Sequence, residues 1–226
     1  MPTTRAARTA RRRVPLDQEQ VLRTALEIAD EGGVEALTMA SVGQKLGVEA
    51  MSLYRHVRNK QEILDGIVDI VFGEIELAPT RTNWKAAMRR RAISARTVLA
   101  RHPWAIGLME SLARPGPANL RHHDAVLGVL HGAGFSSAKA TRAYNLLNSY
   151  IYGFLLQEMS LPFRTREQVA DLGKTILPQM PENEYPHLSR VAVDLAKSGF
   201  VYANEFEAGL DLILDTIETR IRAKAR

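Results

Sequence analysis

The segment 37–60 constrains the fold more than any other part of this chain, because its pattern fits two short helices joined by a tight turn. Thr38 is placed to cap the first helix, and Gly47 supplies the backbone freedom that ends it. The apolar positions of that helix recur at helical spacing, at Met39, Val42 and Leu46. We therefore expect two helices held at a fixed angle, which is a helix-turn-helix.

The second helix is expected to begin near Glu49 and to keep one face against the protein. Leu53 and Val57 lie four residues apart, so both are expected to pack inward. The remaining positions are left for a groove of DNA and its flanking phosphates, and they are Ala50, Met51, Ser52, Tyr54, Arg55 and His56. Outward aromatic and basic side chains on a short helix indicate DNA binding.

The flanking sequence completes a three-helix unit and adds a connecting helix. Asp17 is placed to cap a helix that starts at about residue 18, and Gly32 and Gly33 are placed to end it. Asn59 is placed to cap the connecting helix, whose apolar positions are Ile63, Leu64, Ile67, Val68, Val71 and Phe72. This helix is expected to join the DNA-binding part to the rest of the chain.

Beyond Pro79, helical patterns alternate with breaks that contain proline, and no alternating strand pattern of useful length occurs. The remainder is therefore predicted to be all-α. Helices are expected at 82–101, 104–113, 118–133, 137–158, 165–176, 187–197 and 204–224.

These residues resemble a known family. The run LTMASVGQKLGVEAMSLYRHVRNKQEILDGI is similar to the DNA-binding segment of tetracycline-repressor-family (TetR) transcription regulators, and LGV, LYRHV and NK carry the likeness. Near the C-terminus, FEAGLDLILDTIE resembles the closing helix of the tetracycline-repressor-like branch. The resemblance implies an all-α fold, with an N-terminal three-helix helix-turn-helix domain joined by a connecting helix to a larger helical ligand-binding and dimerisation domain.

Roles within the DNA-binding part follow from chemistry and from the resemblance. Base contacts are expected on the first turn of the second helix, at Ala50, Met51 and Ser52, and Arg55 is able to bind a base bidentately. The resemblance implies phosphate contacts for Tyr54, His56 and Lys60, and Thr38 is expected to reach a phosphate too. Each has a plainer alternative, such as a helix cap for Thr38, core packing for Tyr54 or an ordinary surface imidazole for His56.

Five arginines precede the first acidic residue, Asp17, and they are Arg5, Arg8, Arg11, Arg12 and Arg13. We expect residues 1–16 to form a disordered basic arm that lies along or inside a minor groove, with DNA contacts from Arg11, Arg12 and Arg13. The alternative is a solvated tail. The expected division of the chain is thus an arm at 1–16, a DNA-binding domain at 17–62 and a helical ligand-binding and dimerisation domain at 63–226.

Composition sets further limits. The chain has 226 residues, a formal net charge of +5 and no cysteine, so it can form neither a disulfide framework nor a thiolate site. No apolar run approaches the roughly 20 residues that span a bilayer, and no apolar run follows the basic N-terminus. We expect a cytoplasmic, DNA-associated protein with no membrane contact.

Two segments are expected to form an oligomer surface. The last helix carries a long apolar stripe at Phe206, Leu210, Ile213, Leu214 and Ile217, and the segment 138–158 adds Tyr144, Leu147 and Ile151. Pairing both helices with their symmetry mates gives the four-helix homodimer interface that the resemblance implies. Part of the stripe can instead belong to the core of one chain.

The resemblance also implies a small-molecule pocket, for which the residues of suitable chemistry are Trp84, Met88, Trp104, Met109, Phe135, Asn145, Asn148 and Tyr152. The histidines at 122, 123 and 131 lack metal-site spacing, so no metal and no other cofactor is expected. The chain has no phosphate loop, nucleophile elbow or HExxH motif, which argues against an enzyme. The prediction is a ligand-responsive repressor that binds a palindromic operator as a homodimer, and the alternative is a non-specific architectural DNA-binding protein.

Overall fold

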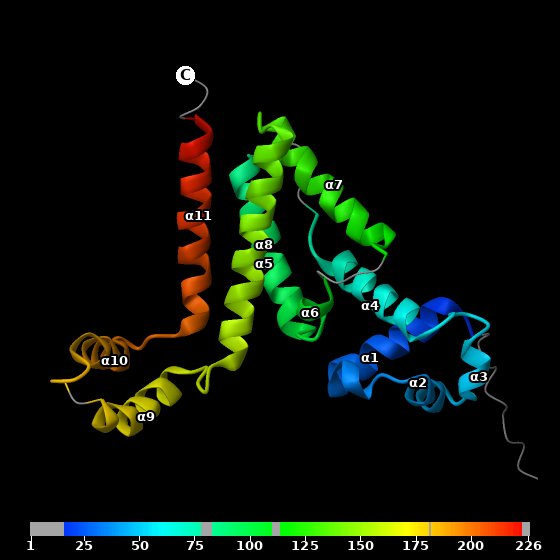
Figure 1. Ribbon diagram of the computed structural model, residues 1–226, viewed down its shortest axis with the longest axis horizontal. Helices are drawn as coiled ribbons and strands as arrows, with labels where there is room; N and C mark the ends of the chain where they lie inside the picture. Colours follow the sequence, from blue (N-terminus) through cyan, green and yellow to red (C-terminus); the bar gives the residue numbers. More distant parts are fainter. Residues whose placement is uncertain (1–15, 78–82, 110–113, 181, 223–226) are drawn as a thin grey trace, which may run out of the picture. The chain divides into compact units, whose positions relative to one another are not determined.

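The structure is a computed structural model that describes residues 16–77, 83–109, 114–180 and 182–222. Throughout these ranges the regular elements are helices, and no strand occurs in them, in agreement with the predicted all-α class (Figure 1). The N-terminal helices are α1 (Gln18–Ala36), α2 (Met39–Leu46), α3 (Ala50–Leu53) and α4 (Lys60–Glu74). The others are α5 (Trp84–Arg101), α6 (Ala105–Met109), α7 (Pro117–Gly132), α8 (Ser137–Ser160), α9 (Arg166–Ile176), α10 (Pro186–Ser198) and α11 (Glu205–Arg222), with short 3₁₀ turns at Leu177–Gln179 and Tyr202–Asn204.

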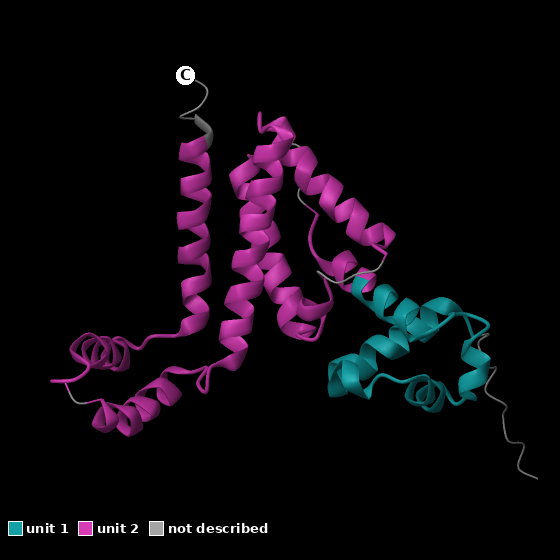
Figure 2. Ribbon diagram, in the orientation of Figure 1, with its two compact units in different colours: residues 1–68 teal, residues 69–226 magenta. Residues whose placement is uncertain are grey.

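The chain divides into two compact units at residues 68 and 69, which we call the head (1–68) and the body (69–226) (Figure 2). The division falls inside α4, a few residues beyond the boundary expected at 62. Ile63 and Ile67 of this helix are buried in the head, whereas Val71 and Phe72 are buried in the body. A single continuous helix therefore contributes to both cores.

The head is built around α1, whose buried face is formed by Val21, Ala25, Ile28 and Ala29. Asp17 caps the helix by accepting a 2.8 Å hydrogen bond from the backbone N–H of Gln20. The predicted end of the helix at the glycine pair is marked by Gly33, which has φ of 75° and interrupts the helix one turn before Ala36. Lys45 of α2 lies 2.8 Å from Glu31 and 3.3 Å from Glu27 of α1, so an ion-pair cluster joins the two helices.

The core of the body lies where α5 packs against α7, α8 and α11. Arg96 of α5 pairs with Glu158 of α8 at 2.6 Å, while its guanidinium lies 5.4 Å from the Phe154 ring centroid and 5.0 Å from that of Phe206. The missing side chain of Gly209 admits the Tyr150 hydroxyl, which donates a 2.9 Å hydrogen bond to the Phe206 carbonyl. These contacts fix α8 and α11 on α5.

Within the body, α4 is tied to α7 by a helix cap. Gly116, the N-cap residue of α7, makes no side-chain cap of its own, and the carboxylate of Asp69 takes that role. Asp69 accepts hydrogen bonds from the backbone N–H groups of Asn119 at 2.8 Å and Ala118 at 3.1 Å. A Cβ at position 116 would collide with this carboxylate, so the glycine is required for the contact.

Candidate functional site

The first helix of the helix-turn-helix, α2, is capped at both ends by hydrogen bonds. Thr38 caps α2 as predicted, because its hydroxyl accepts from the Ser41 N–H at 3.0 Å and the Ser41 hydroxyl accepts from the Thr38 N–H at 2.9 Å. At the other end Gly47 has φ of 69°, and the N–H of Val48 donates to the Gly43 carbonyl at 2.9 Å. This is a Schellman ending, and it fixes the direction in which the chain enters α3.

Gly43, which was not predicted to have a role, is a second glycine on which this turn depends. A Cβ at this position would lie 2.9 Å from the Val48 carbonyl oxygen and 3.1 Å from the Ala50 nitrogen. Both are backbone atoms and cannot swing away as a side-chain tip can. The missing side chain therefore allows the start of α3 to lie directly on α2.

The helix α3 is shorter than the sequence pattern suggested, since its α-helical part covers only Ala50–Leu53 and a turn follows. Leu53 and Val57 are both buried, at 0% and 1% exposure, as expected for the inward face. The N–H of Val57 donates to the Leu53 carbonyl at 3.0 Å, which continues the turn to the second anchor. Two apolar side chains thus hold a segment of one to two turns against the head.

The rest of this segment faces outward to differing degrees. Met51 is 73% exposed and Tyr54 48% exposed, and Arg55 is exposed as well. Ala50, Ser52 and His56 are half-buried. Because Met51 and Tyr54 are large apolar side chains that the head leaves in solvent, α3 presents a surface suited to a partner rather than to the core.

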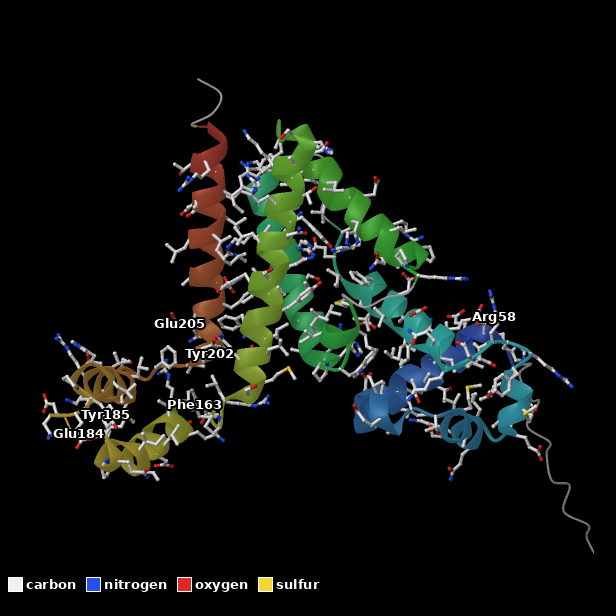
Figure 3. The ribbon with its side chains drawn as sticks, in the orientation of Figure 1. Arg58, Phe163, Glu184, Tyr185, Tyr202 and Glu205 are labelled. Carbon is white, nitrogen blue, oxygen red and sulfur yellow. The ribbon has the colours of Figure 1, made fainter. Side chains whose placement is uncertain are left out.

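The other predicted DNA contacts have neighbours in the head. Lys60, at the start of α4, points its ammonium at the Val34 carbonyl at 3.4 Å, and Thr38 carries the cap described above. Arg58, which was not among the predicted contacts, is exposed (Figure 3). Its Nε lies 3.6 Å from the carboxylate of Glu62. Arg11, Arg12 and Arg13 lie outside the described residues.

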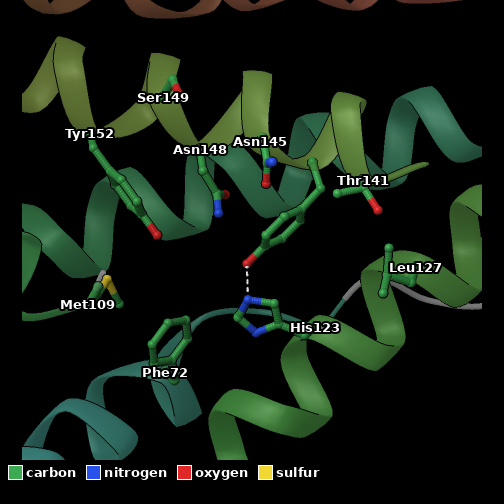
Figure 4. Close-up of a pocket in the computed structure, with 10 residues that line it drawn as sticks. Phe72, Met109, His123, Leu127, Thr141, Asn145, Asn148, Ser149 and Tyr152 are labelled. Atoms are coloured by element: carbon green, nitrogen blue, oxygen red, sulfur yellow. Dashed lines mark hydrogen bonds between the residues drawn. The ribbon is translucent and has the colours of Figure 1, made fainter. Parts of the chain in front are cut away.

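The body contains a cavity of about 680 Å³, which we call the α8 cavity because most of its lining comes from that helix (Figure 4). Thr141, Tyr144, Asn145, Asn148, Ser149 and Tyr152 line it from α8. Phe72 of α4, Met109 of α6, and His123 and Leu127 of α7 complete the wall. Its size falls within the range of about 300–1,000 Å³ that is usual for small-molecule sites.

Four of the eight predicted pocket residues lie in this lining, namely Met109, Asn145, Asn148 and Tyr152. The other four lie elsewhere. Met88 is fully buried in the core, Trp84 packs edge-on against Phe135 at 5.1 Å between ring centroids, and Trp104 neighbours His102. The lining also includes residues that were not predicted for a pocket, which are Phe72, His123, Leu127, Thr141 and Ser149, and Tyr144, which was predicted for the dimer surface. A one-turn spacing from Thr141 through Tyr152 along one face of α8 was the available signal.

A buried polar cluster lies behind one wall of the cavity, formed by Arg91, His122, Tyr144 and Asn148. Nε of Arg91 donates to Nε2 of His122 at 2.9 Å, and Nη2 donates to Oδ1 of Asn148 at 2.7 Å. The guanidinium also lies 5.2 Å from the centroid of the Tyr144 ring. The remaining donors, Nη1 of Arg91 and Nδ1 of His122, are buried without a hydrogen-bond partner.

The two histidines of this region hold fixed tautomers. Burial, helped by Arg91 and His123, lowers the pKa of His122 to about 3, so its ring is neutral near pH 7. Because Nε2 accepts from Arg91, the proton of His122 resides on Nδ1. In His123, Nδ1 lies 2.9 Å from the Asn119 carbonyl, and because a carbonyl only accepts, Nδ1 carries the proton and donates it. Nε2 of His123 then accepts from the Tyr144 hydroxyl at 2.7 Å. Both imidazoles are thus engaged in the hydrogen-bond network of the wall.

Comparison with known proteins bears on both regions. Residues 21–67 match the family described as "Bacterial regulatory proteins, tetR family", and residues 78–221 match the "Tetracyclin repressor-like, C-terminal domain". The chain belongs to the TetR family. This confirms the resemblance on which the sequence analysis relied. The family consists of transcriptional regulators rather than enzymes, and this chain is accordingly a transcriptional regulator with a helix-turn-helix DNA-binding domain.

Individual TetR-family relatives extend the match over most of the chain. An HTH-type transcriptional regulator of Saccharopolyspora erythraea is 32% identical over 155 residues, which cover 68% of this chain and 66% of that protein. The class C tetracycline repressor of Escherichia coli is 28% identical, covering 90% of this chain and 91% of its own. Among solved structures, Streptomyces coelicolor ActR in complex with actinorhodin aligns with a TM-score of 0.75 and 27% identity, over 91% of this chain and 96% of that one.

In this TetR-family chain, most residues that were predicted for a dimer surface lie in the core of the single chain. Leu147, Ile151, Phe206, Leu210 and Leu214 are at most 1% exposed, Tyr144 and Ile217 are also buried, and Ile213 is half-buried. The apolar side chains that α8 and α11 leave in solvent are different ones. They are Leu146, Leu156, Met159 and Leu212, of which Leu212 is 70% exposed.

Two further observations concern metals and membranes. Across the described part of the chain, no group of three histidine, cysteine or carboxylate side chains is arranged to hold a metal ion. Within the same part, none of the helices combines the length and the apolar character needed to cross a membrane.

Proposed function

We propose that this chain is a homodimeric repressor that binds a two-fold-symmetric operator through α3 and is released by a small molecule bound in the α8 cavity. The observation that carries the proposal is the outward face of α3. Met51, Tyr54 and Arg55 are exposed there, while Leu53 and Val57 anchor the segment. The turn that depends on Gly43 and Gly47 fixes the orientation of α3. A rigid helix that presents large exposed side chains is what a recognition element requires.

Within this proposal, residues 17–62 read DNA and the arm at 1–16 adds minor-groove contacts. Met51 and the methylene parts of neighbouring side chains suit thymine methyl groups, while Arg55 is free to reach a base edge. Tyr54, His56, Lys60 and Thr38 are proposed to bind phosphates, and Ala50 and Ser52 to lie close to the base edges. Lys60 would bind a phosphate from its position beside the Val34 carbonyl, and Thr38 from its position as the N-cap of α2.

Dimerisation is proposed to use the exposed faces of α8 and α11 in the body. Leu212 is 70% exposed and Leu156 52% exposed, and Leu146 and Met159 of α8 are exposed as well, so the two helices together offer several apolar side chains to a partner. A partner chain that covers these faces would form a four-helix interface. Two heads related by a two-fold axis could then read half-sites about one DNA turn apart.

Effector control is proposed to act through α4. Phe72 lines the α8 cavity and packs near both histidines of α7, at 5.7 Å from His122 and 6.0 Å from His123 between ring centroids. Asp69, one turn earlier, caps α7. A ligand that shifts Phe72 would therefore act on the helix that also supplies Ile63 and Ile67 to the head, with a coupling free energy of about 1–3 kcal/mol in typical cases.

The experiment that tests this function combines gel shifts on DNA that flanks the protein's own gene with light scattering of the complex. We expect saturable binding that resists excess non-specific DNA and a mass that corresponds to two chains on each duplex. Leu212→Asp is expected to give monomers with weakened DNA binding, whereas Thr97→Asp, an exposed change on α5, should leave the dimer intact. Binding that non-specific DNA competes away fully would favour the architectural alternative.

A further inference from the structure

Arg91 is a buried cation for which the described residues supply no acidic partner. Its side chain is only 2% exposed, and its hydrogen bonds go to neutral groups, the His122 ring and the Asn148 amide. Its Nη1 has no partner, and no carboxylate of the described residues pairs with it. The cost of enclosing a charge in this way is large unless an opposite charge compensates it.

The other arginines of α5 make the contrast plain, since each of them pairs with a carboxylate. The distances from guanidinium nitrogen to carboxylate oxygen are 2.8 Å for Arg89 with Asp211 and 2.6 Å for Arg96 with Glu158. They are 2.8 Å for Arg101 with Glu74 and 3.9 Å for Arg90 with Glu76. These pairs are all at least partly exposed to solvent. Within the described part of the chain, Arg91 is therefore the α5 arginine that has no carboxylate partner, although it is the most deeply buried of them.

Arg91 touches two side chains that line the α8 cavity. Oδ1 of Asn148 accepts from its Nη2, which leaves the amide N–H groups of Asn148 for another acceptor. The Tyr144 ring covers the guanidinium at 5.2 Å. Figure 4 shows the Asn148 amide and the Tyr152 hydroxyl directed into the cavity from the same wall.

We propose that the α8 cavity binds an organic anion, with its acidic group against Asn148 and Tyr152 and with Arg91 behind that wall as the counter-charge. The inference rests on the proposed function of this cavity as the effector site, and it specifies the chemical class of the effector. Phe72, Met109 and Leu127 form the apolar remainder of the lining, so the ligand would carry its acid on an apolar or aromatic body.

The arrangement favours an anion in two ways. The positive charge of Arg91 lies one side chain away in a region of low dielectric, where attraction between charges is strong and salt screens it little. Arg91 also polarises the Asn148 amide by donating to its oxygen, which makes the amide N–H groups better donors. A neutral ligand of the same shape would gain neither effect.

The test uses matched probes on the full-length protein, namely benzoate, 2-naphthoate and anthracene-2-carboxylate, each against its carboxamide. Binding is measured by calorimetry and by the shift in melting temperature at constant ionic strength. We expect at least one acid to bind about tenfold or more tightly than its amide, because charge-assisted hydrogen bonds are worth at least that factor. Amides that bind as well as the acids, or no binding by any of the acids, would overturn the proposal.

Variants assign the preference to Arg91. Arg91→Met is expected to bring each acid to within about twofold of its amide, and Arg91→Lys, which keeps the charge, should retain part of the preference. The control is Arg90→Met, which removes a charge from the same helix at an exposed position paired with Glu76. An unchanged preference in Arg91→Met would contradict the inference.

A second variant places the missing carboxylate inside the chain. Asn148→Asp puts an acid where Oδ1 now lies 2.7 Å from Arg91, so it should raise the melting temperature of the unliganded protein and abolish the preference for acids. Retention of that preference would contradict the role given to Arg91. Glu110 follows the lining residue Met109 in the sequence and lies outside the described residues. Glu110→Gln should leave the preference for acids unchanged. If it alters the preference as Arg91→Met does, the chain supplies its own counter-charge and the proposal is overturned.

These outcomes separate this inference from the proposed function. If the protein binds its operator and is released by amides but not by acids, the proposed function stands and the proposal of an anionic effector is wrong. Conversely, if the protein prefers acids but binds no DNA sequence specifically, the anion site stands and the proposed repressor function is wrong.

Discussion

The head and the body treat buried polar groups in opposite ways. In the head, the buried side chains of the described residues are apolar, and the charged pairs such as Lys45 with Glu31 lie at the surface. In the body, the structure encloses several polar side chains, which are Arg91, His102, Asn119, His122, Asn148 and Ser189. An apolar core with closed caps suits a rigid surface that docks on DNA, whereas enclosed polar groups beside a cavity suit the recognition of a small molecule.

The largest expected effect comes from the apolar core of the head. Leu53→Ala removes a fully buried side chain and should lower the free energy of unfolding of the head by about 2–5 kcal/mol, with loss of operator binding. Met51→Ala, on the same turn but 73% exposed, should leave stability almost unchanged. Urea unfolding followed by circular dichroism measures both. Equal losses in the two variants would mean that α3 is not anchored as described.

The close approach of α2 to α3 gives the next effect. Gly43→Ala places a Cβ against two backbone atoms and should cost about 1–3 kcal/mol of stability while displacing α3 and weakening DNA binding. Its control in the body is Gly128→Ala, where the new Cβ meets no atom within 4 Å in the middle of α7. That change should stabilise the protein by about 0.5–1 kcal/mol. If Gly43→Ala stabilises the protein as Gly128→Ala does, the close contact of α2 with α3 is contradicted.

The buried histidine of the body predicts a dependence of stability on pH. The pKa of His122 falls from 6.5 in the unfolded chain to about 3 in the folded protein, so the unfolded chain takes up the proton first as the pH falls. Stability should therefore decrease below pH 6.5 by about 1.4 kcal/mol for each pH unit until the pH approaches 3. His122→Gln keeps an acceptor for Arg91 and should reduce the slope between pH 6.5 and 5, measured by urea unfolding. His131→Gln, at an exposed position, should not.

The smallest effects on folding stability are expected at the DNA contacts of the head, where substitutions act on binding instead. Lys60→Ala should weaken binding to all sequences alike. It should also reduce the slope of the logarithm of the binding constant against the logarithm of the salt concentration by about one, which corresponds to the loss of one phosphate contact. Arg55→Ala should instead change the sequence preference at one position of each half-site, by about 1–3 kcal/mol if the contact is bidentate. Anisotropy titrations with operator variants at two salt concentrations distinguish the two. Identical behaviour of both variants would contradict the docking proposed for α3.

The caps and turns of the head could be predicted from the sequence, whereas the short length of α3 and the role of Gly43 could not, and the lining of the cavity was predicted only in part. The hydrogen bonds of the caps and turns at Asp17, Thr38 and Gly47 join groups about three to five residues apart, so short stretches of sequence are enough to predict them. The cavity instead needs Phe72, Met109, His123 and Tyr144 from four helices, and its position depends on how those helices pack. Periodicity identified α8 and α11 as amphipathic but did not say which stripe faces α5. Leu210 and Leu147 therefore proved to be core, and Leu212 and Leu156 remain for a partner.

The measurement that tests the central proposal most directly is a hydroxyl-radical footprint of the full-length dimer on DNA that flanks its own gene. If α3 of each chain lies in a major groove, protection should appear as two patches related by two-fold symmetry, about 34–36 Å or one helical turn apart. The same footprint with Leu53→Ala should show no protection. A continuous or asymmetric footprint, or one that survives in Leu53→Ala, would contradict the assignment of DNA reading to the head.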